Sequence, residues 1–221
     1  MKKYFVISIL FFLYACGSQP VPQWKDTAYR QLTDYKANFL ADKEDETEPH
    51  FVKAKKAISS SNDLNLLAVL YLTKYALHTA ALENFDDNDF IRINKLQPNE
   101  ANQSYSDFLK GNFSFLDKSK LPANYQRLMP MIAHKDLPAA ARYIATIDDP
   151  LTRLIACGVW VKYLPHDENL LQLAVNTAAA QGWRKPLWAY LGKLQKYYLE
   201  RQETTKADQI RERLELLHKR Y

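Results

Sequence analysis

The chain has 221 residues, of which 47% are hydrophobic and 25% are charged, and its formal net charge is +5. This length suits one domain, or two small ones, with a full hydrophobic core. Only 5 glycines and 2 cysteines are present, which disfavours glycine-rich phosphate loops and excludes a disulfide scaffold. The composition therefore indicates a globular and predominantly helical protein.

Residues 1–15 have the order of a secretory signal peptide. A basic start at Lys2 and Lys3 precedes an apolar run from Tyr4 to Tyr14, and the small residue Ala15 follows it. The run is too short to span a bilayer as an ordinary transmembrane helix. The sequence therefore predicts export of the chain, with residues 1–15 as the signal.

The end of this run, Leu13-Tyr14-Ala15-Cys16-Gly17, resembles the lipobox of bacterial lipoproteins. The resemblance implies cleavage before Cys16 and lipidation of Cys16, palmitate included. Because Gly17 is not an aspartate, it also implies sorting to the outer membrane, with the body expected in the periplasm. Two alternatives stay open: an ordinary signal peptide that carries a cysteine, and an uncleaved anchor.

Residues 16–23 form a polar tether with two prolines, Pro20 and Pro22. The seven residues that follow Cys16 reach at most about 25 Å when extended. We therefore expect the folded body, residues 24–221, to stay close to the membrane surface as a single helical domain. Its first part, 24–121, is less regular than its second part, 122–221.

The first predicted helix, over 24–41, has apolar residues at steps of three and four, which is typical of an amphipathic helix. The acidic run 42–48 leads into Pro49, which predicts a helix start there and an end at Ser59–Ser61. Asn62 or Asp63 would cap the next helix, 64–82. That helix is apolar nearly all round.

Helix 64–82 could be read as a membrane span, but Lys74 and His78 lie within it. A charge near the bilayer centre costs about 3 kcal/mol even on the mildest scales. We therefore interpret this helix as the buried centre of the domain.

From Asn84 to Leu121 only short helices are predicted, around Phe90 and over 105–109. The polar cluster 86–89 lacks the spacing of a calcium loop and indicates a helix cap.

After Pro122 the pattern becomes regular and predicts the helices 122–134, 136–147, 149–164, 167–181, 184–202 and 204–221. Pro130 should split or kink the first of them. The linkers of two to four residues imply antiparallel neighbours. The sequence therefore predicts an all-α fold of antiparallel helical hairpins, arranged as an α-solenoid.

The last two predicted helices resemble the tetratricopeptide repeat, in which large residues of one helix precede a small alanine early in the next. The residues that carry the resemblance are Leu191, Leu194, Tyr198, Ala207 and Leu214. It covers about 30 residues. This resemblance implies a tetratricopeptide-like array, a class of fold that commonly binds other proteins.

Motifs of known catalytic chemistry are missing from the sequence: no GxSxG, HExxH, P-loop, GxGxxG or CxxC occurs. The histidines have no metal-ligand spacing, and the consecutive residues of His166-Asp167-Glu168 would point in different directions. Cys157 lies in an apolar stretch and is interpreted as a small buried hydrophobe rather than a nucleophile. We therefore predict no catalytic residue, no metal and no cofactor.

Charge is unevenly distributed along the chain. Residues 184–221 contain ten basic and five acidic residues, whereas 16–183 have a net charge of −2. Aromatic residues interleave with this basic end, and they are either the core beneath a solvated face or part of a contact surface. Because Trp, Tyr and Arg dominate interface energetics, the predicted partner-binding residues are Trp183, Arg184, Lys185, Trp188 and Tyr197.

The predicted outer-membrane location and the absence of catalytic motifs favour a non-enzymatic adaptor or assembly factor that binds another envelope protein. No small-molecule substrate is expected, and nucleic acid is disfavoured outside the cytoplasm. The alternative is a periplasmic hydrolase or cell-wall-modifying enzyme with an unrecognised site. A pocket with His166 or Cys157 beside a carboxylate would favour the enzyme, and an aromatic groove would favour the adaptor.

Overall fold

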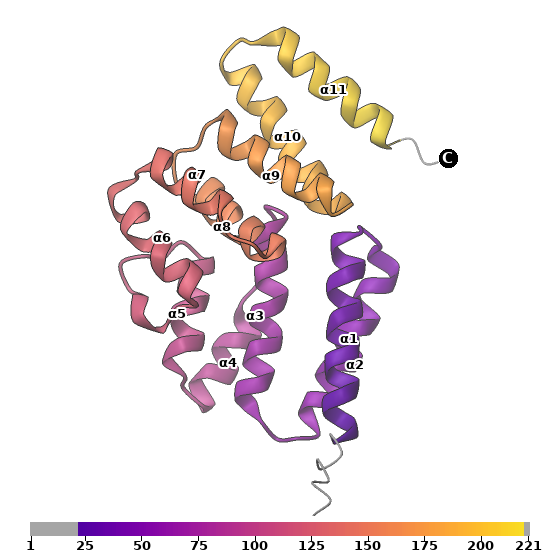
Figure 1. Ribbon diagram of the computed structural model, residues 1–221. Helices are drawn as coiled ribbons and strands as arrows, with labels where there is room; N and C mark the ends of the chain where they lie inside the picture. Colours follow the sequence, from indigo (N-terminus) through magenta and orange to yellow (C-terminus); the bar gives the residue numbers. More distant parts are fainter. Residues whose placement is uncertain (1–21, 219–221) are drawn as a thin grey trace, which may run out of the picture.

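The computed structural model describes residues 22–218 and is all-helical in this range, with eleven α-helices, one short 3-10 helix and no strand (Figure 1). The predicted all-α class is confirmed. The signal peptide 1–15, Cys16 and most of the tether 16–23 lie outside the described residues.

The first part of the chain forms a long hairpin, a central helix and two shorter helices. The bounds are α1 (Gln23–Leu40), α2 (Glu44–Ser59), α3 (Leu64–Ala80), α4 (Asn88–Leu96), α5 (Glu100–Leu109) and the 3-10 helix η1 (Lys118–Lys120). The expected short helices of this part are therefore α4 and α5. α4 begins inside the polar cluster 86–89, with Asp87 as its N-cap residue, but the side chain of Asp87 makes no capping hydrogen bond. The backbone N–H of Asn88 donates instead to the Asp86 carboxylate at 3.0 Å.

The second part forms successive antiparallel helices joined by short turns. The bounds are α6 (Ala123–His134), α7 (Leu137–Ala145), α8 (Pro150–Tyr163), α9 (Glu168–Ala180), α10 (Arg184–Glu200) and α11 (Thr204–His218). The carboxylates of Asp149 and Asp167 accept backbone N–H groups and cap α8 and α9. This arrangement agrees with the predicted array of helical hairpins.

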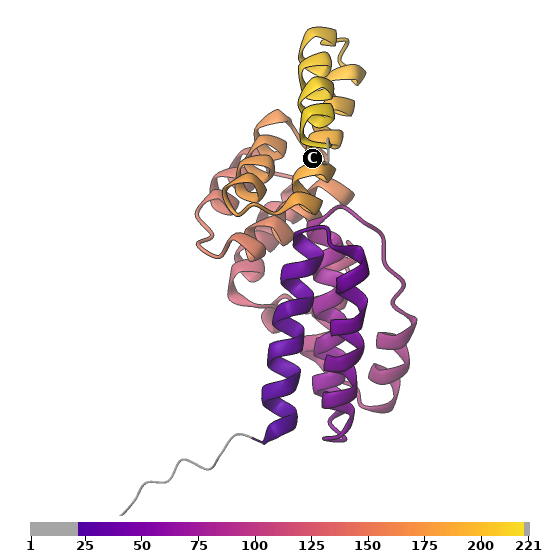
Figure 2. The same cartoon turned by 90° about the vertical axis from the view of Figure 1, so that its right-hand side faces the viewer.

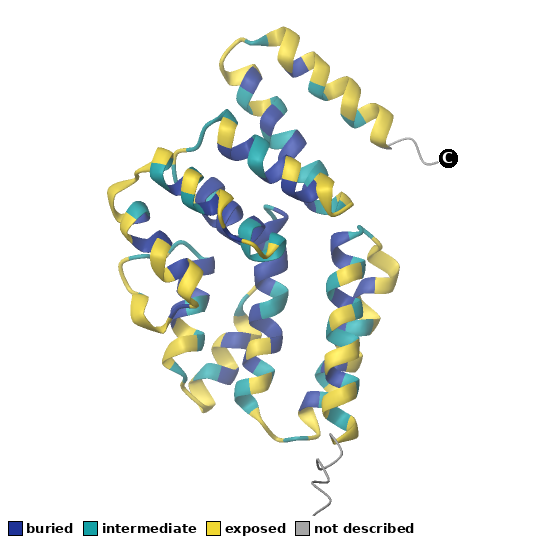
Figure 3. Cartoon of the chain, viewed as in Figure 1, coloured by how far each residue is buried: buried dark blue, intermediate teal, exposed yellow. Residues whose placement is uncertain are grey.

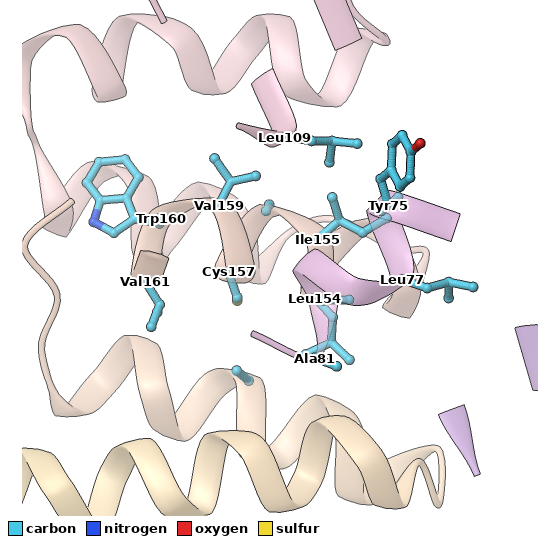
Figure 4. Close-up of a cluster of buried hydrophobic side chains, with 14 of the residues drawn as sticks. Tyr75, Leu77, Ala81, Leu109, Leu154, Ile155, Cys157, Val159, Trp160 and Val161 are labelled. Atoms are coloured by element: carbon cyan, nitrogen blue, oxygen red, sulfur yellow. The ribbon is translucent and has the colours of Figure 1, made fainter. Parts of the chain in front are cut away.

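The core is centred on α3 and α8, which pack against each other (Figure 4). α3 also contacts α1, α2, α4 and α5, so the predicted central helix is covered by neighbouring helices. At the crossing, the helix backbones approach closely because Gly158 of α8 lies against the carbonyl of Thr79 in α3. Within residues 22–218, no helix combines the length and the apolar character that a membrane crossing requires.

Pro49, which was expected at a helix start, lies inside a helix, and Pro130, which was expected to split or kink a helix, does not split it. α2 begins at Glu44, so Pro49 is its sixth residue, and α6 runs through Pro130 without a break. A proline leaves the carbonyl four residues earlier without its helical donor. In α2 and α6 these carbonyls belong to Asp45 and Gln126, which are exposed like the prolines themselves, so water can bond them.

Helix ends in this chain rarely use glycine. Five non-glycine residues have a positive φ in the turns between helices, among them Asp42 at 61° and Gln202 at 61°. Glycine occupies this left-handed conformation most easily, and other residues strain to adopt it. The turns between these helices therefore form without glycine at most positions that have a positive φ.

The last hairpin, α10–α11, extends from the rest of the body (Figures 1 and 2). The residues that resemble the tetratricopeptide pattern lie between these helices or beneath them. Leu191, Leu194, Tyr198 and Ala207 are buried, and Leu214 is half-buried. The same hydrophobic cluster reaches back to Ala28 of α1.

Candidate functional site

The predicted partner-binding residues lie along α10, but they do not form one surface. Trp188 and Tyr197 are nine residues apart, or about two and a half helical turns, so they lie on opposite sides of the helix. The guanidinium of Arg184 lies 4.7 Å from the centre of the Trp188 ring, and that of Arg201 lies 4.4 Å from the centre of the Tyr197 ring. Trp183 directly precedes α10, and its side chain is half-buried, like those of Trp188 and Tyr197.

Lys185 points into the molecule, unlike the exposed Arg184 beside it. Its side chain is only 14% exposed, and its ammonium lies 2.9 Å from Asp42, 3.3 Å from Glu44 and 3.4 Å from Glu83. Burial lowers the pKa of Lys185, but the hydrogen bond that its ammonium donates to Asp42 and the charge of Glu83 outweigh burial and raise the pKa above its ordinary value. The structure therefore places Lys185 in an intramolecular ion cluster.

This ion cluster lines a cleft of about 240 Å³ between the α1–α2 hairpin, α3 and α10. We call it the charged cleft; its lining residues are Tyr35, Phe39, Glu44, Thr47, Glu48, Lys74, His78, Glu83 and Lys185. A ring nitrogen of His78 lies 2.7 Å from the Glu83 carboxylate, and Lys74 pairs with Glu48 at 3.0 Å. Burial raises the pKa of Glu83, but its hydrogen bonds with His78 and Lys185 lower it overall.

The charged cleft contains pairs of opposite charge rather than an activated nucleophile. Its one hydroxyl of serine or threonine type, on Thr47, donates to the carbonyl of Lys43 at 2.6 Å and is thereby used within α2. Within residues 22–218, no group of three or more histidine, cysteine or acidic side chains could hold a metal ion. Instead, Lys185 of α10 pairs both with Asp42, in the α1–α2 turn, and with Glu83, after α3.

The two residues that would have favoured an enzyme are placed unfavourably for catalysis. Cys157 is fully buried, which raises the pKa of its thiol to about 12. His166 lies 3.2 Å from the carbonyl of Leu164 and forms no hydrogen bond to a carboxylate among the described residues. Burial lowers the pKa of His166. The hydrolase hypothesis therefore gains no support from Cys157 or His166.

A second hollow, which the sequence patterns did not single out, lies where α1 begins and α2 ends. It is a groove of about 400 Å³, which we call the basic groove. α1 contributes Gln23, Trp24, Thr27 and Gln31, and α2 contributes Lys53, Lys56 and Ala57. Ser60, the residue that follows α2, completes the lining. The signal that could have found it is the charge order of α2, in which acidic residues end at Glu48 and lysines follow.

Comparison with known proteins supplies no relative: no family model, no curated protein and no solved structure matches this chain.

Proposed function

We propose that this chain is a lipoprotein anchored to the outer membrane through Cys16, with a periplasmic body that acts as a non-enzymatic adaptor. The partner is another envelope protein, which the body helps to assemble or to localise. The observation that supports this proposal most strongly is the open carboxy-terminal hairpin, α10–α11, at the end of the helical array.

α11 contributes little to the core. It packs chiefly against α10, and Ala207 is its one buried residue over 204–217. Two leucines near its end are exposed, Leu216 at 67% and Leu217 at 42% (Figure 3 shows the exposed face of α11). A terminal helix that leaves leucines in solvent offers apolar surface for a partner helix or for a further hairpin.

α10 also presents one face that includes exposed residues. Arg184, Trp188, Gly192 and Leu199 follow one another at steps of four, four and seven, which places them on the same side of the helix. Leu199 is 53% exposed. A side chain added at Gly192 would meet no atom within 4 Å, so the space above this residue is open. Open space beside an aromatic ring can receive a side chain of the partner.

Charge indicates which partner surface suits this hairpin. Residues 184–221 have a net charge of +5, while the rest of the chain after the predicted signal is slightly acidic. An acidic partner surface would therefore be attracted to the hairpin, and the apolar face of α10 would supply the specific contacts.

The proposal is tested in two steps on the full chain in cells. The Cys16→Ala variant should move from the membrane fraction to the soluble fraction, and retention of this variant in the membrane would contradict the anchor. For the adaptor, a photo-crosslinking residue at position 199 should form a defined adduct with one envelope protein. The matched control is position 96, where Leu96 is 76% exposed on α4. Equal adducts at both positions would contradict a specific surface on α10.

The adduct at position 199 should also disappear when Arg184 is changed to Glu. The control substitution is Arg92→Glu, which reverses a positive charge that is also exposed, on α4. If Arg184→Glu leaves the adduct unchanged while Arg92→Glu removes it, the binding surface lies on α4 rather than on α10.

A further inference from the structure

The basic groove lies at the end of the body that is closest to the predicted anchor. The described chain begins at Pro22, six residues after Cys16, and six extended residues span at most about 20 Å. α1 begins beside the end of α2 because the two helices form an antiparallel hairpin (Figure 2). A lipid on Cys16 would therefore hold this end of the hairpin within a short distance of the bilayer.

The lysines of the groove are available to a ligand. Lys53 and Lys56 are exposed, and neither forms an ion pair with a residue that the structure describes. By contrast, Lys55 lies 5.4 Å from the centre of the Tyr71 ring, and Lys74 pairs with Glu48. Lys53 and Lys56 are one helical turn apart, so both ammonium groups lie along the same side of α2.

Acidic residues are few at this end of the hairpin. The segment 49–62 contains none, whereas 42–48 contains five. Asp26 and Asp34 on α1 and Asp63 are the acidic residues nearest in sequence to the groove. The Asp34 carboxylate lies 3.8 Å from a ring nitrogen of His50, and the Asp63 carboxylate accepts the backbone N–H of Leu66. α2 is thus acidic at the charged cleft and basic at the end next to the chain start.

Trp24 completes the groove on the side of α1. Its indole is half-buried in the groove wall, and the ammonium of Lys25 lies 5.4 Å from the ring centre. Tryptophan is enriched at the boundary between lipid headgroups and water because it has a large apolar ring and a polar N–H. The groove therefore combines the two kinds of side chain that favour a membrane surface.

We propose that the basic groove is a docking surface for an anionic bilayer, with Lys53 and Lys56 binding phospholipid phosphates and Trp24 inserting at the headgroup level. This inference rests on the proposed anchor at Cys16, which would place the groove against the membrane. A surface contact of this kind orients the body, so that α10–α11, at the other end of the molecule, points away from the bilayer (Figure 1).

The test uses the folded body without a lipid, residues 17–221, which contains the whole hydrophobic core of the described structure. The probes are neutral vesicles of phosphatidylcholine and anionic vesicles that also contain about 30% phosphatidylglycerol. We expect the body to sediment with the anionic vesicles and not with the neutral ones, and we expect 0.5 M salt to weaken the binding through screening. Equal sedimentation with both vesicles, or with neither, would overturn the proposal.

The groove itself is tested with Lys53→Gln/Lys56→Gln. Each lysine near an anionic surface contributes about five-fold to partitioning, so the double variant should bind about 25-fold more weakly. The matched control is Lys193→Gln/Lys196→Gln, which removes two lysines at the same spacing from α10. A larger loss in this control would place the membrane contact on the carboxy-terminal hairpin and overturn the proposal.

The depth of the Trp24 ring in the bilayer is measured by fluorescence quenching with lipids that carry bromine on their acyl chains. The signal of Trp24 is the difference between the body and its Trp24→Phe variant, and this signal should be quenched on anionic vesicles. An unquenched Trp24 in the bound protein would contradict insertion of the ring. None of these measurements involves Cys16, so failure of the anchor in cells and failure of the groove are distinguishable.

Discussion

The ammonium of Lys185, in the first turn of α10, lies 2.9 Å from the carboxylate of Asp42, in the turn between α1 and α2. This ion pair connects the first hairpin of the chain with the last one. Both side chains are largely buried, at 14% and 17% exposure. Its stability therefore depends on packing that brings together distant parts of the sequence.

We expect Lys185→Met to lower the free energy of unfolding by about 2 kcal/mol, because it leaves the buried Asp42 carboxylate without its cation. The measurement is urea unfolding followed by circular dichroism at neutral pH. The control is Lys196→Met, whose pair with Glu200 is exposed and should contribute less than about 0.5 kcal/mol. Equal midpoints for Lys185→Met and the unmodified protein would show that the ion cluster does not stabilise the fold.

The ion cluster also predicts a dependence of stability on pH. The pKa of Glu83 is lowered in the folded state, so the ionised carboxylate stabilises the fold above the unfolded pKa of about 4.3. This contribution is lost as the pH falls through the lowered folded pKa. Glu83→Gln removes the titrating group, so the stability difference between the two proteins should shrink from pH 6 to pH 3. Urea midpoints over this range measure it.

A control for this titration is Glu212→Gln, on the exposed side of α11. Its stability difference from the unmodified protein should stay near zero throughout the acid range. If Glu83→Gln and Glu212→Gln give the same profile, the carboxylate of Glu83 does not contribute to acid sensitivity.

Two glycine substitutions, one at the crossing of α3 and α8 and one on α10, should have opposite effects on stability. A Cβ at Gly158 would overlap the carbonyl oxygen of Thr79 and lie 2.8 Å from its carbonyl carbon, so Gly158→Ala should destabilise the protein by about 3 kcal/mol. A Cβ at Gly192 meets open space, and Gly192→Ala should stabilise α10 by up to about 1 kcal/mol through helix propensity. Thermal unfolding of both variants measures the contrast, and a similar loss in both would disprove the close approach.

The thiol of Cys157 should be unreactive in the folded protein. It is fully buried and its pKa is raised to about 12, so almost no thiolate is present at neutral pH. We expect a maleimide to label the body, residues 17–221, at least 100-fold more slowly in buffer than in concentrated urea. Ser60→Cys, at an exposed position, supplies a second thiol that should react rapidly in the folded state. Fast labelling of Cys157 itself would indicate an open path to the core.

Most of the helices could be predicted from the sequence because the signals are local. Apolar steps of three and four residues mark α1, and Asp149 and Asp167 cap the helices that follow them. Pro49 misled the prediction of a helix start, and Pro130 does not split α6, for the opposite reason. Whether a proline ends a helix depends on whether water can bond the freed carbonyl, and this depends on burial in the tertiary structure.

By itself, the sequence determined the all-α class, the order of the hairpins and the burial of Cys157, since periodicity and capping act over a few residues. Only the tertiary structure decided that Lys185 faces inward while Arg184 faces solvent, and that Trp24 meets Lys53 and Lys56 in one groove. These relationships depend on which helices pack side by side. That choice is made by long-range contacts such as Gly158 against Thr79, which leave no periodic signal in the chain.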